Sequence, residues 1–182
     1  MSQNKKENNI KEGEHLSLYG VGPFYGFIII LITLIAIFNR NFSFLSYGKI
    51  SFLQIPLLII GTLLILLSIY IWIQAVIIAK VDEGIKNNKL VTTGIYGWVR
   101  HPIYSAITML CTGILFISGN VFFFVLPFLY WLIFSILVKN TEEKWLRELY
   151  GKEYDDYCRQ VNRCIPWKSK LNNVKKEIIK NE

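Results

Sequence analysis

The sequence predicts an all-α integral membrane protein with about four transmembrane helices. The chain has 182 residues, 53% of them hydrophobic, and its apolar residues gather in long uncharged blocks rather than in a globular pattern. About 20 uncharged residues are enough to cross the roughly 30 Å hydrocarbon core of a bilayer. Because a soluble fold rarely contains four such blocks, we interpret them as membrane spans rather than as buried core helices.

The predicted spans follow one another along most of the chain. They cover residues 20–38, 52–79, 103–118 and 121–138. Only Gly119 and Asn120 separate the last two spans, and a link this short forces an antiparallel helical hairpin.

The organisation around the spans follows from composition. Residues 1–18 are polar and lack the features of a secretory signal. We expect four parts: the N-terminal tail 1–18, the first two spans in 19–79, a loop with the hairpin and a C-terminal segment in 80–167, and a basic tail in 168–182.

The distribution of lysine and arginine predicts the orientation. One side of the membrane carries only Arg40 and Lys49. The opposite side carries the basic C-terminal tail together with Lys5, Lys6, Lys11, Lys80, Lys86, Lys89 and Arg100. The positive-inside rule therefore places both termini and the 80–102 loop in the cytoplasm. We expect the basic tail to contact anionic lipid, since no nucleic-acid-binding motif accompanies it.

Pro102 determines the local structure of the polar and aromatic stretch LVTTGIYGWVRHPIY, residues 90–104. Proline suits the first turn of a helix and disfavours the helical conformation for the residue before it, His101. Residues 92–94 predict a turn just upstream. The start of a helix presents free N–H groups, and Arg100 lies beside it, so this segment can seat a carboxylate or phosphate.

The hairpin brings a pair of glutamates to the same place. Counted outward from the turn, Pro102 has the depth of about residue 136 or 137 on the returning span. Glu142 and Glu143 follow roughly 6–10 Å further on, at about 1.5 Å per residue. We therefore expect them beside Arg100 and His101.

The residues after the hairpin predict an amphipathic cytoplasmic segment of two short helices. Thr141 is a candidate N-cap, and Gly151 suits the end of the first helix. Tyr154 and Tyr157 belong to a second helix that Pro166 stops. An apolar stripe at helical spacing is formed by Trp145, Leu146, Leu149 and Tyr150.

Each feature taken alone has a simpler interpretation. The aromatic residues around Tyr96 and Trp98 fit an interfacial belt, Arg100 fits a topological anchor, and the glutamates fit a solvated helix start. The three cysteines and two histidines form neither a Cys-x-x-Cys pair nor a Cys/His cluster, so we predict no metal site.

The ordered combination is more specific than its parts. GIYGWVRHPIY, then a hairpin, then EEKWLRELYGKEYDDYCRQVNRCIPW resembles the isoprenylcysteine carboxyl methyltransferases and the related phospholipid methyltransferases. Their pattern is Leu-Val-Thr-x-Gly-x-Tyr, Arg-His-Pro-x-Tyr, Glu-Glu, Gly-x-x-Tyr-x-x-Tyr and Arg-x-x-Pro. The resemblance covers residues 88–167 and implies a methyltransferase core in 80–167.

The resemblance implies a site for S-adenosylmethionine. A strand-like segment would lie along the adenine, an aromatic ring would close over the nucleoside, the start of the third span would line the methionine end, and the glutamates would hold the ammonium or ribose. The implied cofactor-binding residues are, in that order, Lys89, Leu90 and Val91; Tyr96; His101, Pro102, Ile103 and Tyr104; Glu142 and Glu143. Arg100 and His101 are the candidate catalytic residues, and His101 is the first candidate for a general base.

Two positions depart from the family pattern. Ala106 stands where many relatives have glycine, and Val138, followed by Lys139, stands where the carboxyl methyltransferases carry a substrate-binding arginine. These departures argue against a prenylcysteine carboxylate substrate more than against cofactor binding. The acceptor would be lipophilic or presented by the membrane, either isoprenylcysteine-like or phospholipid-like.

Two other functions fit parts of the sequence. A non-enzymatic membrane protein could use the 90–104 loop as an anchor and partner surface, and it would bind no cofactor. A membrane reductase is the other alternative, because some sterol reductases have a similar C-terminal half. Such an enzyme would use a nicotinamide cofactor, and the short chain argues against this function.

Overall fold

The computed structural model describes residues 21–79 and 89–167, and the regular structure within them is helical. The helices and short helical turns are α2 (Gly22–Phe38), α3 (Ser43–Ser46), η1 (Ser51–Leu53), α4 (Gln54–Ile73), η2 (Gln74–Ile78), η3 (Gly94–Gly97), α6 (Pro102–Ile117), η4 (Val121–Phe124), α7 (Val125–Asn140), α8 (Glu142–Tyr150) and α9 (Lys152–Gln160). In these ranges, β-type backbone pairing is limited to two isolated bridges. They join Lys49 to Asn120 and Val99 to Asn162. The prediction of an all-α protein is confirmed.

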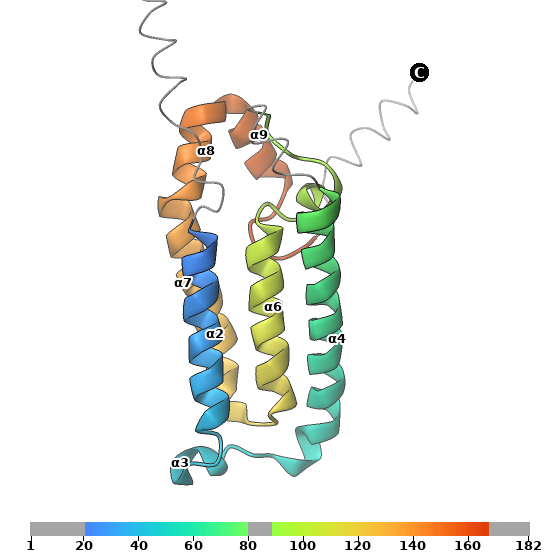
Figure 1. Ribbon diagram of the computed structural model, residues 1–182, viewed down its shortest axis with the longest axis vertical. Helices are drawn as coiled ribbons and strands as arrows, with labels where there is room; N and C mark the ends of the chain where they lie inside the picture. Colours follow the sequence, from blue (N-terminus) through green and yellow to red (C-terminus); the bar gives the residue numbers. More distant parts are fainter. Residues whose placement is uncertain (1–20, 80–88, 168–182) are drawn as a thin grey trace, which may run out of the picture.

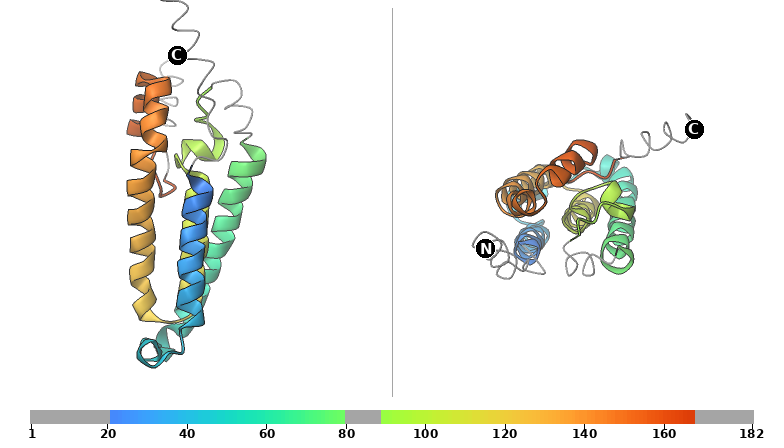
Figure 2. Two further views of the ribbon diagram at one scale, coloured as in Figure 1. Left: turned by 60° about the vertical axis from the view of Figure 1, so that its left-hand side comes forward. Right: turned by 90° about the horizontal axis from the view of Figure 1, so that it is seen from above.

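The four long helices α2, α4, α6 and α7 lie side by side in an elongated bundle (Figure 1). The link containing α3 lies at one end. At the other end α8 extends α7, and α9 turns back toward α6 (Figures 1 and 2). The two ends of the bundle therefore differ in structure, and the predicted site residues gather at the α8–α9 end.

The most extensive helix pair is α4 with α6, and it depends on two glycines. A Cβ added to Gly61 would lie 2.6 Å from the Gly113 carbonyl oxygen, and one added to Gly113 would lie 2.7 Å from the Gly61 carbonyl oxygen. Small residues allow membrane helices to approach this closely, where dispersion contacts stabilise the pair.

Buried hydroxyl groups join α2 to α6 and α7. The Tyr25 hydroxyl lies 2.7 Å from Thr108 Oγ1 and 3.2 Å from the Tyr130 carbonyl oxygen. Thr33 Oγ1 lies 2.8 Å from the Tyr130 hydroxyl. A polar group left unpaired in an apolar interior costs free energy, so these mutual hydrogen bonds permit four hydroxyls inside the bundle.

Two helical stretches, Ser51–Ile78 and Val121–Tyr150, are long and apolar enough to cross a membrane. Only 17% and 22% of their most apolar windows are buried, so most of these side chains face outward, as expected in lipid but not in water. The apolar helices Gly22–Phe38 and Pro102–Ile117 are shorter, about 25 Å at 1.5 Å per residue. The protein is therefore a membrane protein with two long and two shorter apolar helices.

Two local predictions need correction. The Thr141 hydroxyl donates to the Leu137 carbonyl oxygen of the preceding helix and does not cap α8. The second amphipathic helix, α9, ends at Gln160, well before Pro166, because the backbone becomes extended at Val161. The two predicted helices, α8 and α9, nevertheless form, and Gly151, with φ of 53°, separates them.

Several predictions concern residues outside the described ranges. These are the polar N-terminal tail, the basic C-terminal tail, and the lysines at positions 5, 6, 11, 80 and 86. The orientation drawn from those lysines and the boundaries of the four parts of the chain stay predictions.

Candidate functional site

Glu142 and Glu143 begin α8 directly beside the loop that enters α6. Arg100 Nη2 lies 3.0 Å from Glu143 Oε1. The ring of His101 lies between the two carboxylates, with Nδ1 3.5 Å from Glu142 Oε2 and Nε2 3.6 Å from Glu143 Oε1. The hairpin therefore brings the loop and the glutamates together, as the depth of the two segments predicts.

Arg163 completes this charge cluster. Its Nε and Nη2 atoms donate to Glu143 Oε1 and Oε2, each at 2.8 Å. This bidentate geometry is the strongest that arginine forms with a carboxylate. Arg163 was not among the predicted site residues, although it is the arginine of the terminal Arg-x-x-Pro pattern.

Glu143 is the buried centre of the cluster, with only 1% of its side chain exposed. Burial by itself would raise the pKa of this carboxyl, but contacts with His101 and Arg163 and the positive charges of Arg100 and Arg163 hold the pKa well below its usual range. Glu143 is therefore ionised, and it fixes both arginines in place.

Glu142 is more accessible, with 18% of its side chain exposed. It accepts hydrogen bonds from the Tyr104 hydroxyl and from the Val21 backbone N–H, the latter at 3.0 Å. Burial would raise the pKa of Glu142, but His101, Tyr104 and the Val21 amide together lower it. The site thus offers a second carboxylate that is charged and within reach of a ligand.

Two buried side-chain nitrogen atoms in the site have no hydrogen-bond partner among the described residues. They are Arg100 Nε and His101 Nε2. An unpaired buried polar atom costs free energy, so such atoms in a native structure call for an explanation. A bound ligand that accepts from Arg100 Nε and contacts His101 Nε2 would supply the missing partners.

The C-terminal segment 162–167 fixes the loop by backbone pairing. Three hydrogen bonds with N···O distances of 2.8–3.3 Å join residues 98–101 to this segment. The Tyr157 hydroxyl donates to the Tyr96 carbonyl oxygen at 2.6 Å. The loop is therefore held rigidly between α9, the C-terminal segment and the start of α6.

The segment predicted to be strand-like forms no strand. Lys89, Leu90 and Val91 have no regular secondary structure, and the backbone bridge forms later, at Val99. Leu90 packs against the buried cluster Tyr154, Tyr157 and Val161, which belongs to α9 and its C-terminal end. The parallel pairing of the loop with the C-terminal segment takes the place of the expected strand.

Aromatic rings form a wall around His101. Its ring centroid lies 5.8 Å from that of Tyr104 and 5.9 Å from that of Phe134, both in edge-on geometry. Phe134 projects from α7 and is fully buried. Aromatic rings attract a cationic group such as a sulfonium, and Phe134 is a second residue of the site that the sequence analysis missed.

An apolar cavity of about 250 Å³ lies between α4 and α6. Trp72 and Ile69 on its rim are also exposed on the outer surface of the bundle, so the cavity borders the region that lipid would occupy. It is lined by Ser68, Ile69, Trp72, Ala106, Ile107 and Leu110.

Residues 51–153 match the family model described as phospholipid methyltransferase. The chain belongs to this family. The protein-S-isoprenylcysteine O-methyltransferases of Schizosaccharomyces pombe and Saccharomyces cerevisiae are 36% and 35% identical to it over 85 and 86 residues. A probable protein-S-isoprenylcysteine O-methyltransferase of Oryza sativa subsp. indica is 32% identical over 82 residues.

These alignments cover 44% of this chain and 34–42% of the relatives, so the match spans well under half the length of those proteins. No solved structure matches the chain significantly. The resemblance to isoprenylcysteine and phospholipid methyltransferases is confirmed, and this protein is a member of a membrane methyltransferase family.

Proposed function

We propose that this protein transfers a methyl group from S-adenosylmethionine to a lipophilic or membrane-presented acceptor. The observation that carries the proposal is the placement of Arg100 and His101, with unpaired buried nitrogens, beside the accessible carboxylate of Glu142. This combination matches the charges of an amino-acid ligand. Family membership supports the reaction type.

The chemistry of these residues fits the proposed cofactor. Glu142 would hold its ammonium group, and the free Nε–H of Arg100 would donate to its carboxylate. The rings of Tyr104 and Phe134 would face the sulfonium. When bound, the cofactor supplies a methyl group that is already activated for displacement.

The remaining predicted residues take supporting roles. Glu143 would act as a positioning residue, because both of its oxygens already bind arginines. Pro102 and Ile103 would shape the methionine end. The adenine and nucleoside would lie along the segment Lys89, Leu90, Val91 and Tyr96.

Methyl transfer is an in-line displacement, so alignment of the two reactants supplies much of the rate acceleration. A carboxylate acceptor needs no base. For an amine or hydroxyl acceptor, His101 Nε2 would take the proton, since Glu142 beside Nδ1 favours the tautomer with its proton on that atom.

The acceptor side of the site favours a phospholipid-like substrate. Val138 is fully buried in the bundle and offers no charge where the carboxyl methyltransferases carry arginine. The apolar cavity between α4 and α6 suits a hydrocarbon chain that enters from the bilayer. An isoprenylcysteine-like acceptor is the alternative, supported by the names of the relatives.

We further propose that α2, α4, α6 and α7 all span the membrane, with both termini and the site on the cytoplasmic side. The helices α8 and α9 would lie on the inner face as a lid. The location of Lys89 and Arg100 at the site end of the bundle supports this orientation under the positive-inside rule.

Calorimetric titration with S-adenosylmethionine tests the proposal on full-length protein in detergent and in lipid nanodiscs. We expect binding that Glu142→Gln weakens at least tenfold, because charged hydrogen bonds contribute about 1.5–3 kcal/mol. Glu148→Gln removes an exposed carboxylate from the same helix and should leave the affinity unchanged.

Folded protein that binds no S-adenosylmethionine in either medium would refute the proposal. If it binds, labelled methyl groups should enter phospholipid, and incorporation only into a prenylcysteine analogue would reassign the acceptor.

A further inference from the structure

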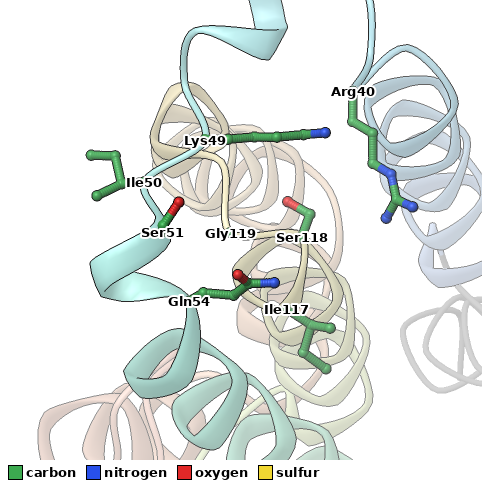
Figure 3. A pocket seen from close by; sticks show the side chains of 8 residues that line it. All are labelled: Arg40, Lys49, Ile50, Ser51, Gln54, Ile117, Ser118 and Gly119. Atoms are coloured by element: carbon green, nitrogen blue, oxygen red, sulfur yellow. The ribbon is translucent and has the colours of Figure 1, made fainter.

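A second cavity, of about 260 Å³ and polar in its lining, lies at the α3 end of the bundle, opposite the glutamate cluster. It is formed where the link from α2 to α4 meets the turn after α6 (Figure 3). The lining residues are Arg40, Lys49, Ile50, Ser51, Gln54, Ile117, Ser118 and Gly119.

The two cations of this cavity lack an acidic partner. The sequence contains no aspartate or glutamate in residues 21–79 or 103–141. Lys49 Nζ donates to the neutral amide oxygen of Asn41 at 2.8 Å, and Arg40 forms no ion pair with any residue of the described ranges. Two positive charges bordering one cavity repel each other, and an anion between them would remove that cost.

Neutral polar groups add to the anion-binding character of the cavity. Figure 3 shows Lys49 extending toward Arg40 across the cavity, with the Ser118 hydroxyl and the Gln54 amide on the side facing α6. Ser51 lies at the start of the helical segment that leads into α4. These hydroxyl and amide groups can donate hydrogen bonds to an oxyanion.

The walls of the cavity are held together by specific hydrogen bonds. Buried Asn120 donates to the Leu45 carbonyl oxygen at 2.7 Å, and the Val121 N–H donates to the Gly48 carbonyl oxygen at 2.9 Å. A Cβ on Gly48 would lie 2.2 Å from Asn120 Oδ1, so only glycine fits. The link and the hairpin turn are thus fixed against each other.

Exposed aromatic side chains surround this end of the bundle. Phe42, Tyr47 and Phe52 are largely exposed, and Phe44 stacks on Phe122 with a centroid distance of 5.1 Å. Exposed aromatic residues mark the level of lipid head groups. The cavity therefore lies at the depth where phosphate groups of lipids are found.

We propose that this cavity binds the phosphate of an anionic phospholipid in the leaflet opposite the glutamate cluster. Two cations favour a head group with net negative charge, whereas the ammonium group of a zwitterionic lipid would be repelled. The bound lipid would clamp the α2–α4 link against the α6–α7 turn.

The test uses delipidated full-length protein in a neutral detergent. It is titrated with dioctanoyl phosphatidylglycerol, with dioctanoyl phosphatidylcholine and with inorganic phosphate, and thermal unfolding reports binding. We expect protection by phosphatidylglycerol in preference to the other two. The double variant Arg40→Gln with Lys49→Gln should bind phosphatidylglycerol about 30-fold more weakly, from the usual contribution of two interfacial cations.

Two further variants keep the test decisive. Arg40→Lys with Lys49→Arg retains the charge and should retain most of the binding. Lys152→Gln with Arg159→Gln removes two exposed cations from α9 and should bind as the wild type does. Equal protection by both lipids, or an equal loss in the α9 variant, would overturn the proposal; equal protection by inorganic phosphate would assign the cavity to a free anion and overturn its lipid part.

Discussion

Replacement of Arg163 by alanine is the sharpest test of the charge cluster. Arg163 donates two hydrogen bonds of 2.8 Å to Glu143. The variant leaves Glu143, which is 1% exposed, with Arg100 at 3.0 Å as its one remaining arginine partner among the described residues. The prediction concerns stability, so it is independent of any bound ligand.

The expected loss of stability is about 3 kcal/mol. Charge-assisted hydrogen bonds contribute about 1.5–3 kcal/mol each, and removal of one partner from a buried ion pair costs about 3–5 kcal/mol. Arg163 is 29% exposed, so solvent screening places its contribution at the lower end of this range. At about 2–4 °C per kcal/mol for a chain of this size, the melting temperature should fall by about 6–12 °C.

The assay is thermal unfolding of purified protein in one detergent, followed by circular dichroism. Arg159→Ala is the matched control, because Arg159 is 79% exposed and its one ion pair among the described residues is with Asp156 at 3.5 Å. Exposed pairs of this kind contribute about 0–1 kcal/mol. If both variants melted within about 1 °C of each other, Glu143 would not depend on Arg163 and the reasoning would be refuted.

Three other predictions test different features. The pKa of Glu143 is lowered in the folded state, so its stabilising contribution is complete above pH of about 4.5 and is lost as the pH falls further. Unfolding temperatures measured against pH should show a smaller acid loss in Glu143→Gln than in the wild type, because only the contribution of Glu142 then remains. Gly61→Ala should lower the free energy of unfolding by about 1–2 kcal/mol, since overpacking against Gly113 outweighs the gain in helix propensity. Gly22→Ala is the control, because a Cβ there has its nearest contact at 3.4 Å, and it should leave the unfolding temperature unchanged. Burial raises the pKa of the Cys164 thiol to about 11. In a variant with the other cysteines replaced by serine, alkylation of Cys164 at pH 8 should therefore be about 100-fold slower than that of an ordinary thiol. Alkylation at the ordinary rate would contradict this.

The meeting of the loop with the glutamates was predictable because it depends on short-range geometry. A two-residue link fixes the relative depth of the two helices, and the rise per residue then places Glu142 beside His101. Pro102 fixes the start of α6 in the same local way. Such inferences need no knowledge of how distant side chains pack.

The missed residues depend on contacts that local rules do not describe. Phe134 lies in a largely apolar part of α7, where hydropathy alone cannot separate a ring that faces the site from one that faces lipid. Arg163 reaches Glu143 only because the C-terminal segment pairs with the loop. The cap prediction for Thr141 failed because its hydroxyl found an acceptor one turn earlier, at Leu137.

The pairing of the loop with the C-terminal segment has a consequence for the order of events during synthesis. The Tyr157 hydroxyl binds a carbonyl 61 residues earlier in the chain, and translation adds about 5–20 residues per second. The ribosome therefore synthesises Tyr157 roughly 3–12 seconds after the loop residue that it binds. During that interval α2 and α4 are already synthesised, while Arg100 still lacks Glu143. Assembly of the charge cluster is thus among the last events in the biogenesis of this protein, and loss of α8 and α9 would leave the bundle without it.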